Sequence, residues 1–230
     1  FSVDGTWLFV GSPRATATYN YEGEIAVYKL DNTGTYNLIN YLNAYLPLVG
    51  KQFSSSIVCR DDTLIVGARG ANNKRGSVEI FKLSNDLWSY DQTLVEDVVA
   101  GADYGTNVRT SDDLSIVAIS APGSNPGQVF IYKLVSGQYV LDQTITGNDI
   151  NFSIGLSMSP SGSYLAVGST WYNGDKIDQG KVEGNTRLEV VGVTSNIHAK
   201  VVQVLDGVQS SSNTKTLYVR SEEHTSELQS

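Results

Sequence analysis

One eight-residue phrase occurs three times along this 230-residue chain at nearly constant spacing. The three copies begin with glycine, continue with a mostly apolar run and end in Lys-Leu: Gly23–Leu30, Gly76–Leu83 and Gly127–Leu134. Their glycines are 53 and 51 residues apart, and a shorter copy, Gly180–Val182, follows after another 53. A fixed period of about 50 residues is typical of supersecondary units that stack on one another. The repeat therefore constrains the fold more than any other feature.

Each repeat contains four short segments of strand composition, which we name A to D along the chain. The glycine phrase is strand C, and runs rich in β-branched and aromatic residues flank it. Strand B is predicted within four such runs: Leu8–Pro13, Leu64–Arg69, Ile116–Pro122 and Leu165–Thr170. Polar turns such as Asp61-Asp62 and Asp112-Asp113 separate strand A from strand B, because aspartate suits turn backbone geometry.

Four antiparallel strands at this period predict an all-β fold, a fragment of a β-propeller built from four-stranded blades and followed by a short β module. A two-sheet sandwich is the alternative, but it would not require near-identical phrases at fixed spacing. Residues 1–182 are expected to form three to four blades, and the chain is expected to begin inside a blade because Phe1 is no initiator. Residues 183–219 read as a small β module or a degraded blade, and both readings stay open.

The repeat resembles the FG-GAP repeats of integrin-type propellers. Tyr104-Gly105 matches the FG element, and the GAP element is divided among Gly11–Pro13, Gly67–Arg69 and Ser120–Pro122. Many members of that family carry an Asp- and Asn-rich calcium loop between strands A and B. Calcium takes about six to eight oxygen ligands, whereas each turn here offers two adjacent acids at most. We therefore predict turn chemistry, no metal and no cofactor.

The C-terminal part departs from the repeat. Residues 192–202 and 213–220 weakly resemble a small β module of tailed-phage baseplate and tail proteins. Residues 220–230 resemble a translated sequencing adapter, so we exclude them from functional reasoning as one excludes a tag.

Composition excludes several classes of function. The net charge is −8 and no basic stripe occurs, which argues against nucleic acid as a partner. No apolar run approaches membrane-spanning length. Cys59 is the single cysteine, and His198 is the only histidine outside the adapter-like tail, so neither a His-rich metal site nor a Ser-His-Asp triad is expected.

Ligand recognition is expected in the loops between strands B and C, which vary most among the repeats and share one propeller face with the D–A links. The candidate ligand-binding residues are aromatic or basic: Arg14, Tyr19, Tyr21, Lys74, Arg75, Trp171 and Tyr172. Aromatic faces stack on sugars or anchor protein partners. A loop aromatic packed over a blade edge is the competing interpretation.

From these observations we expect a non-catalytic binding or structural propeller that recognises glycan or protein, in a virion tail or a surface adhesion protein, and located in the virion or outside the cell. Virion assembly partners would fit that setting. The alternative is a polysaccharide hydrolase or lyase that uses channel carboxylates. Glu96, Asp97 and Asp103, in one D–A link, form the acidic cluster outside the turns that would serve it.

Overall fold

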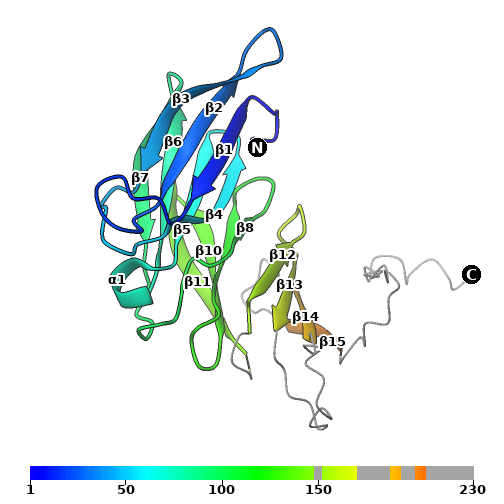
Figure 1. The fold of residues 1–230 in the computed structure, drawn as a ribbon. Helices are drawn as coiled ribbons and strands as arrows, with labels where there is room; N and C mark the ends of the chain where they lie inside the picture. Colours follow the sequence, from blue (N-terminus) through cyan, green and yellow to red (C-terminus); the bar gives the residue numbers. More distant parts are fainter. Residues whose placement is uncertain (148–151, 170–186, 193–199, 206–230) are drawn as a thin grey trace, which may run out of the picture.

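The chain forms four antiparallel β-sheets side by side in a computed structural model that describes residues 1–147, 152–169, 187–192 and 200–205 (Figure 1). The first sheet has three strands: β1 (Trp7–Ser12), β2 (Glu24–Leu30) and β3 (Tyr36–Asn43). The second has four: β4 (Phe53–Arg60), β5 (Thr63–Ala68), β6 (Ser77–Ser84) and β7 (Leu87–Leu94). The third is β8 (Val108–Thr110), β9 (Ile116–Ala121), β10 (Gln128–Val135) and β11 (Gln138–Thr146).

The fourth sheet is β12 (Gly155–Met158), β13 (Tyr164–Ser169), β14 (Arg187–Gly192) and β15 (Lys200–Leu205). Its third and fourth places are thus taken by residues after 182, since β14 pairs with β13 and β15 with β14. The shorter phrase copy, Gly180–Val182, lies outside the described residues. A single short helix, α1 (Ala71–Lys74), occurs in the described part of the chain, between β5 and β6.

The prediction of an all-β fold with four-stranded antiparallel blades is confirmed. The repeated phrase forms β2, β6 and β10, and the predicted B runs form β1, β5, β9 and β13. Strand A of the third sheet begins only at Val108, because Tyr104 makes a bridge to Gly76 of the preceding blade and Gly105 turns the chain with φ +88°.

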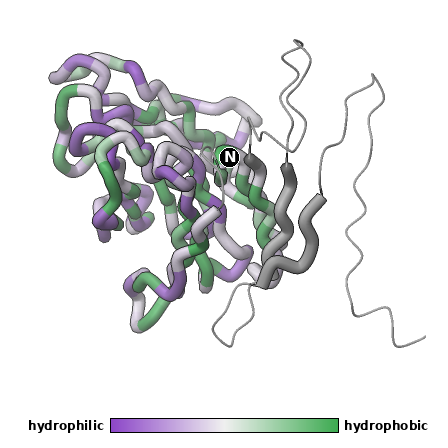
Figure 2. Tube along the Cα trace, turned by 90° about the horizontal axis from the view of Figure 1, so that it is seen from below, coloured by the Kyte–Doolittle hydropathy of each residue, from purple (hydrophilic) through white to green (hydrophobic). Residues whose placement is uncertain are grey.

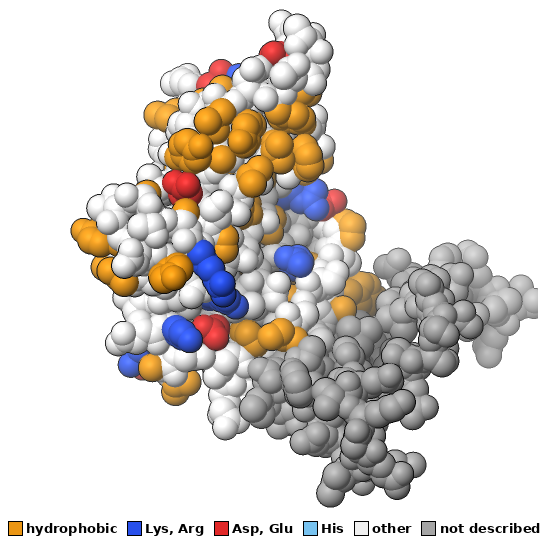
Figure 3. All heavy atoms as spheres, in the orientation of Figure 1, with side chains coloured by type: hydrophobic (Ala, Val, Ile, Leu, Met, Phe, Trp, Pro, Cys, Tyr) orange, Lys and Arg blue, Asp and Glu red, His pale blue; other side chains and the backbone are white. Residues whose placement is uncertain are grey.

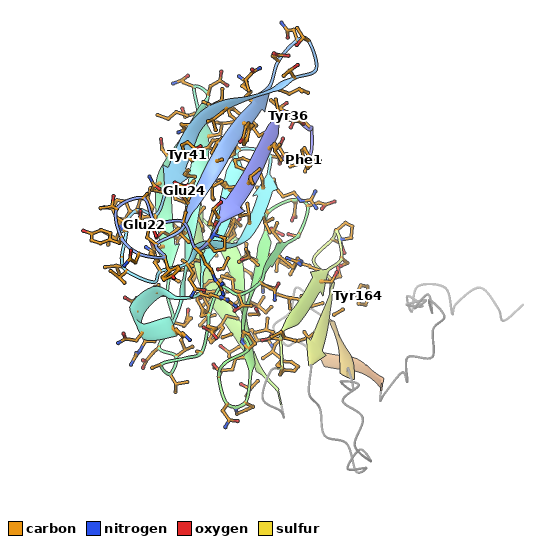
Figure 4. All side chains as sticks on the ribbon, viewed as in Figure 1. Phe1, Glu22, Glu24, Tyr36, Tyr41 and Tyr164 are labelled. Atoms are coloured by element: carbon orange, nitrogen blue, oxygen red, sulfur yellow. The ribbon has the colours of Figure 1, made fainter. Side chains whose placement is uncertain are left out.

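Neighbouring sheets pack face to face through their inner strands. The strand β4 contacts β1 and β8, and β8 contacts β12. All six residues of β5 are buried because neighbouring blades cover both of its faces. Figure 2 shows hydrophobic stretches along the strands and hydrophilic ones toward the loops. In the first blade, Phe1 packs edge-on against Tyr36, with ring centroids 5.8 Å apart (Figure 4).

The A–B turns of the first and third blades share one hydrogen-bond pattern. Asp113 accepts from the Ser111 hydroxyl at 2.6 Å and from the Ser115 backbone N–H at 3.0 Å, and the Ile116 N–H donates to Ser111 Oγ. Asp4 makes the same contacts with Ser2 and Thr6 in the first blade. These carboxylates are occupied by the turn, as the sequence predicts.

The glycine of the phrase is required by the next blade. A β-carbon at Gly23 would lie 2.2 Å from the carbonyl oxygen of Phe53, and one at Gly127 would lie 2.2 Å from that of Phe152. No side chain fits at such distances, so the phrase begins with glycine wherever one blade meets the next.

Candidate functional site

The B–C loops and the D–A links meet in pairs along one side of the sheets, on the side of the molecule that carries α1 (Figure 1). Each pair is joined by backbone hydrogen bonds. Gln52 N–H donates to the Tyr21 carbonyl at 3.0 Å, and Asp103 N–H donates to the Lys74 carbonyl at 2.8 Å. Gln52 and Asp103 therefore occupy equivalent places at successive blade junctions. All four residues have positive φ, so both junctions use the same strained backbone.

Asp103 is the half-buried carboxylate of this loop face. Its φ is +54°, and its carbonyl accepts both the N–H and the hydroxyl of Thr106. Burial raises the pKa of the Asp103 carboxyl above its ordinary value, while the charges of Arg69 and Lys74 oppose that rise. Among the described residues the carboxylate has neither a hydrogen bond nor an ion pair, so it is open to a ligand.

Arg69, one of the two cations whose charge acts on this carboxylate, follows β5 directly. Its Nε donates to Gln52 Oε1 at 2.8 Å, and its backbone N–H donates to Ser55 Oγ at 3.1 Å. The first contact orients the guanidinium group, and the second holds the backbone at the base of the side chain. An arginine has five N–H donors, and those other than Nε–H make no hydrogen bond among the described residues, so they can serve an anionic group. Gln52 and Arg69 thus bring an amide and a cation together, and the charge of Arg69 acts on the carboxylate of Asp103.

The other two acids of the predicted cluster are used elsewhere. Glu96 accepts from the Tyr132 hydroxyl, which also bonds the buried Tyr104 hydroxyl at 2.6 Å. Asp97 is fully exposed and lies 3.5 Å from Arg75. Asp103 is the member of this cluster whose pKa is raised by burial against the opposing charges of Arg69 and Lys74.

The predicted ligand-binding residues lie at two junctions. Arg14, Tyr19 and Tyr21 are exposed in the loop between β1 and β2, near Glu22, whose buried carboxylate accepts from the N–H groups of residues 18 and 19 (Figure 4). Lys74 and Arg75 are exposed at the end of α1. Trp171 and Tyr172 lie outside the described residues. Arg14, Tyr19 and Tyr21 thus lie in the B–C loop of the first blade and Lys74 and Arg75 in that of the second, and the charge of Lys74 acts on Asp103.

Charged side chains of both signs are interspersed over the lower part of the face shown in Figure 3. No group of three or more metal-ligating side chains occurs in the part of the chain that the structure describes. No helix in the described ranges has the length and apolar character needed to cross a bilayer.

Neither a protein-family model nor a curated protein sequence matches the chain. Solved structures do. The chain is similar to a candidate 6-phosphogluconolactonase from Bacteroides fragilis, with a TM-score of 0.64 and 13% identity over 90% of this chain and 53% of that one. It is also similar to a protein from Lactobacillus plantarum, with a TM-score of 0.58 and 16% identity over 87% and 54% of the two chains. TolB from Acinetobacter baumannii matches with a TM-score of 0.52 and 13% identity over 91% and 43%.

The fold is that of a β-propeller. The chain spans about half the length of the first two structures that it matches, 53% and 54%. At such identities the likeness establishes the fold, and the activity has to be argued from the site.

The comparison corrects the expected function. The prediction of a non-catalytic propeller in a virion tail or adhesion protein was wrong, because the solved folds to which the chain is similar point to enzyme-like or other propellers, led by a lactonase candidate. The prediction that the chain is not an enzyme is overturned by the same finding. The physical reason for the error is that acids in D–A links were judged from sequence neighbours, which cannot show that the charge of Arg69, from another loop, acts on the half-buried Asp103.

Sequence reasoning named Asp103 and Lys74 but missed Gln52 and Arg69. Arg69 stands where two other repeats have Pro13 and Pro122, so a comparison of the repeats with one another would have found it.

Proposed function

We propose that this chain belongs to a propeller hydrolase that opens the lactone ring of an acidic or phosphorylated sugar. One observation carries the proposal: the half-buried carboxylate of Asp103 on the loop face makes no hydrogen bond or ion pair among the described residues, and its pKa responds to the charges of Arg69 and Lys74. The 6-phosphogluconolactonase candidate from B. fragilis supplies the substrate class. This chain spans about half of that protein. We therefore propose Asp103, Arg69 and Lys74 as part of a site that includes further residues.

The chemistry needs a base and positive charge. In lactone hydrolysis, the oxygen of water attacks the carbonyl carbon, Asp103 takes the proton of the water, and negative charge develops on the carbonyl oxygen. The ring C–O bond then breaks, and the proton returns to the departing alcohol oxygen. A carboxylate whose pKa is raised by burial is a better base near neutrality than an ordinary aspartate.

Arg69 and Lys74 would serve the anionic part of the substrate. A guanidinium binds carboxylate or phosphate through paired N–H donors, and Gln52 already holds the Arg69 Nε in a defined direction. Lys74 is exposed on α1, and its charge acts on the same carboxylate. Two cations beside one carboxylate suit a substrate that carries at least one negative charge.

The test is to measure the rate of 6-phosphoglucono-δ-lactone hydrolysis by pH-stat titration and to subtract the spontaneous rate. The chain is expected to accelerate opening, and Asp103→Asn is expected to lower the rate by about 100-fold or more. The matched control is Asp97→Asn, which removes an exposed acid from the same link and should leave the rate unchanged. A rate equal to the spontaneous one, or an Asp103→Asn variant as fast as the parent, would refute the proposal.

Several finer sequence-based interpretations have no further support and stay predictions. They are the FG-GAP assignment, the baseplate-like and adapter-like readings after residue 182, the division at residues 182 and 219, a glycan or protein partner, and an extracellular location.

A further inference from the structure

A buried hydrogen-bonded network joins strand β10 to the D–A link between the second and third blades, residues 95–107. The Tyr132 hydroxyl of β10 donates to Glu96 Oε1, and the Tyr104 hydroxyl lies 2.6 Å from that of Tyr132. Because the proton of Tyr132 goes to the carboxylate, Tyr104 is the donor of the second bond. Tyr104 and Tyr132 are 0% and 2% exposed. We name Glu96, Tyr132 and Tyr104 the tyrosine–glutamate network.

Packing alone does not require these hydroxyls. In the second blade, Phe53 and Phe81 pack edge-on with ring centroids 5.9 Å apart and carry no hydroxyl. Phe53 is equivalent to Tyr104, because the N–H of each donates to the carbonyl directly before the phrase glycine of the previous blade. Phe81 and Tyr132 are equivalent because each lies five residues after the phrase glycine of its own blade. Burying a hydroxyl costs free energy that a phenylalanine avoids, so the network calls for a reason beyond packing.

The network holds the link at two points. Glu96 lies near its start and Tyr104 near its end, and both bond the same hydroxyl, so one residue of β10 closes residues 97–103 into a loop. Asp103 directly precedes Tyr104 and has a φ of +54°, a backbone conformation that the surroundings must maintain. A displacement of Tyr104 therefore reaches Asp103 through a single peptide bond.

We propose that Tyr132 is a positioning residue, whose hydroxyl holds Tyr104 and thereby fixes the place of the Asp103 carboxylate. That Asp103 is the base of lactone opening rests on the proposed function, whereas the connection between Tyr132 and Asp103 rests on the hydrogen bonds. Tyr132 lies in the core between the second and third blades and is too buried to touch a substrate. Its effect on the rate comes from the position of the base, and a misplacement of about 1 Å can lower a rate about 100-fold.

The first test is the kinetics of 6-phosphoglucono-δ-lactone hydrolysis by the 230-residue chain. Tyr132→Phe removes the hydroxyl but keeps the ring, and it should lower kcat about tenfold or more while KM changes less than about twofold. The matched control is Tyr139→Phe, because Tyr139 is also buried, at 5% exposed, and its hydroxyl donates to the Leu114 carbonyl at 2.9 Å, outside the link. It should lose similar stability and keep the parent kcat. Equal kcat values in the two variants would overturn the proposal.

Variants of Glu96 separate position from charge. Glu96→Gln keeps a side-chain oxygen that accepts the Tyr132 proton, so kcat should stay within about twofold of the parent value. Glu96→Ala removes the acceptor and should lower kcat as Tyr132→Phe does. A low kcat in Glu96→Gln would assign a role to the charge of Glu96 and would overturn the positional role of the network.

An NMR titration tests the positioning without any substrate. Burial raises the pKa of the Asp103 carboxyl, while the charges of Arg69 and Lys74 oppose the rise. In Tyr132→Phe the link is no longer held and the carboxyl gains contact with water, so the midpoint of its carboxyl-carbon titration should fall by about 0.5 or more. Tyr139→Phe should leave the midpoint unchanged.

The two readouts distinguish this proposal from the proposed function. An unchanged Asp103 midpoint in Tyr132→Phe would refute the positioning, whether or not the chain hydrolyses lactones. A parent chain that hydrolyses no lactone, together with a lowered midpoint in this variant, would refute the proposed function and support the positioning.

A double variant keeps the proposal testable if Tyr132→Phe does not fold. Tyr104→Phe combined with Tyr132→Phe installs the Phe53–Phe81 arrangement of the second blade, so its melting temperature should be unchanged or higher. It should still show the lower kcat and the lower Asp103 midpoint. A double variant with the kcat and the midpoint of the parent would overturn the proposal.

Discussion

Gly76 packs so closely against Tyr104 that a β-carbon at Gly76 would lie 1.9 Å from the Tyr104 carbonyl oxygen. The two residues also form a parallel β-bridge, and Gly76 has a φ of +96°. The repeated glycine of the sequence is thus the point where the backbone of one blade rests on the next. The same contact places Asp103, the residue before Tyr104, beside Lys74 and holds the candidate site together.

Gly76→Ala should destabilise the chain by at least about 3 kcal/mol, because it adds both a strained φ and a contact that the backbone must move to relieve. Urea unfolding followed by tryptophan fluorescence measures the difference. The matched control is Gly34→Ala, where φ is +83° but no atom lies within 4 Å of the new carbon. It should cost only about 1 kcal/mol for the strained backbone. Equal losses in the two variants would show that the contact with Tyr104 is unimportant.

Much of the fold follows from the sequence because stacking imposes local requirements. Positions 23, 76 and 127 require glycine because the backbone of the next blade leaves no room for a β-carbon. Strands β5 and β9 are mostly apolar because neighbouring blades cover both of their faces. A repeat makes such requirements visible, since the same residue type recurs wherever the same contact recurs.

The candidate site follows much less from the sequence, because its residues are those that depart from the repeat. Asp103 replaces Gln52 and Arg69 replaces proline, and the effect of one charge on the other depends on how two blades pack. The hydroxyls of Tyr104 and Tyr132 likewise occur where the second blade has Phe53 and Phe81. Departures from a repeat are therefore better guides to function here than the repeat itself.

Arg69→Gln should raise the KM for an anionic lactone about tenfold or more and leave kcat nearly unchanged, because it removes a substrate-binding charge and keeps the base. Steady-state kinetics by pH-stat titration separates the two parameters. The control is Arg75→Gln, which removes an exposed cation paired with Asp97. A fall in kcat with unchanged KM would assign Arg69 to the transition state.

Asp103 should make both rate and stability depend on pH. Its folded pKa is raised, so the carboxyl favours folding most when protonated, and that contribution is lost as pH rises through the folded pKa. Asp103→Asn should therefore be at least as stable as the parent at pH 7, with a smaller change of stability between pH 4 and pH 7. The parent's lactone hydrolysis should fall as pH drops through the same range, because the base becomes protonated. Urea unfolding and pH-stat rates measure the two effects.

Asp113 should have the opposite pH dependence. Hydrogen bonds from Ser111 and Ser115 lower the pKa of its carboxyl from 3.8 to about 2. The stabilisation is present above pH 3.8 and is lost as pH falls toward about 2. Asp113→Ala should cost about 1 kcal/mol at pH 7, the value of a lost turn-capping interaction, and the difference should shrink in acid. Asp97→Ala, an exposed acid without turn contacts, should show neither effect.

Calcium should not stabilise this propeller. The Asp4 and Asp113 carboxylates accept hydrogen bonds from Ser, Thr and backbone donors of their own turns, and a calcium ion would have to displace these donors. The described residues offer no group of three metal-ligating side chains, whereas calcium takes about six to eight oxygen ligands. The melting temperature should therefore be the same in excess chelator and in millimolar calcium, measured by calorimetry on the chain without residues 220–230. A calcium-dependent rise that disappears in Asp61→Ala or Asp112→Ala would contradict this expectation and place a metal in the A–B turns.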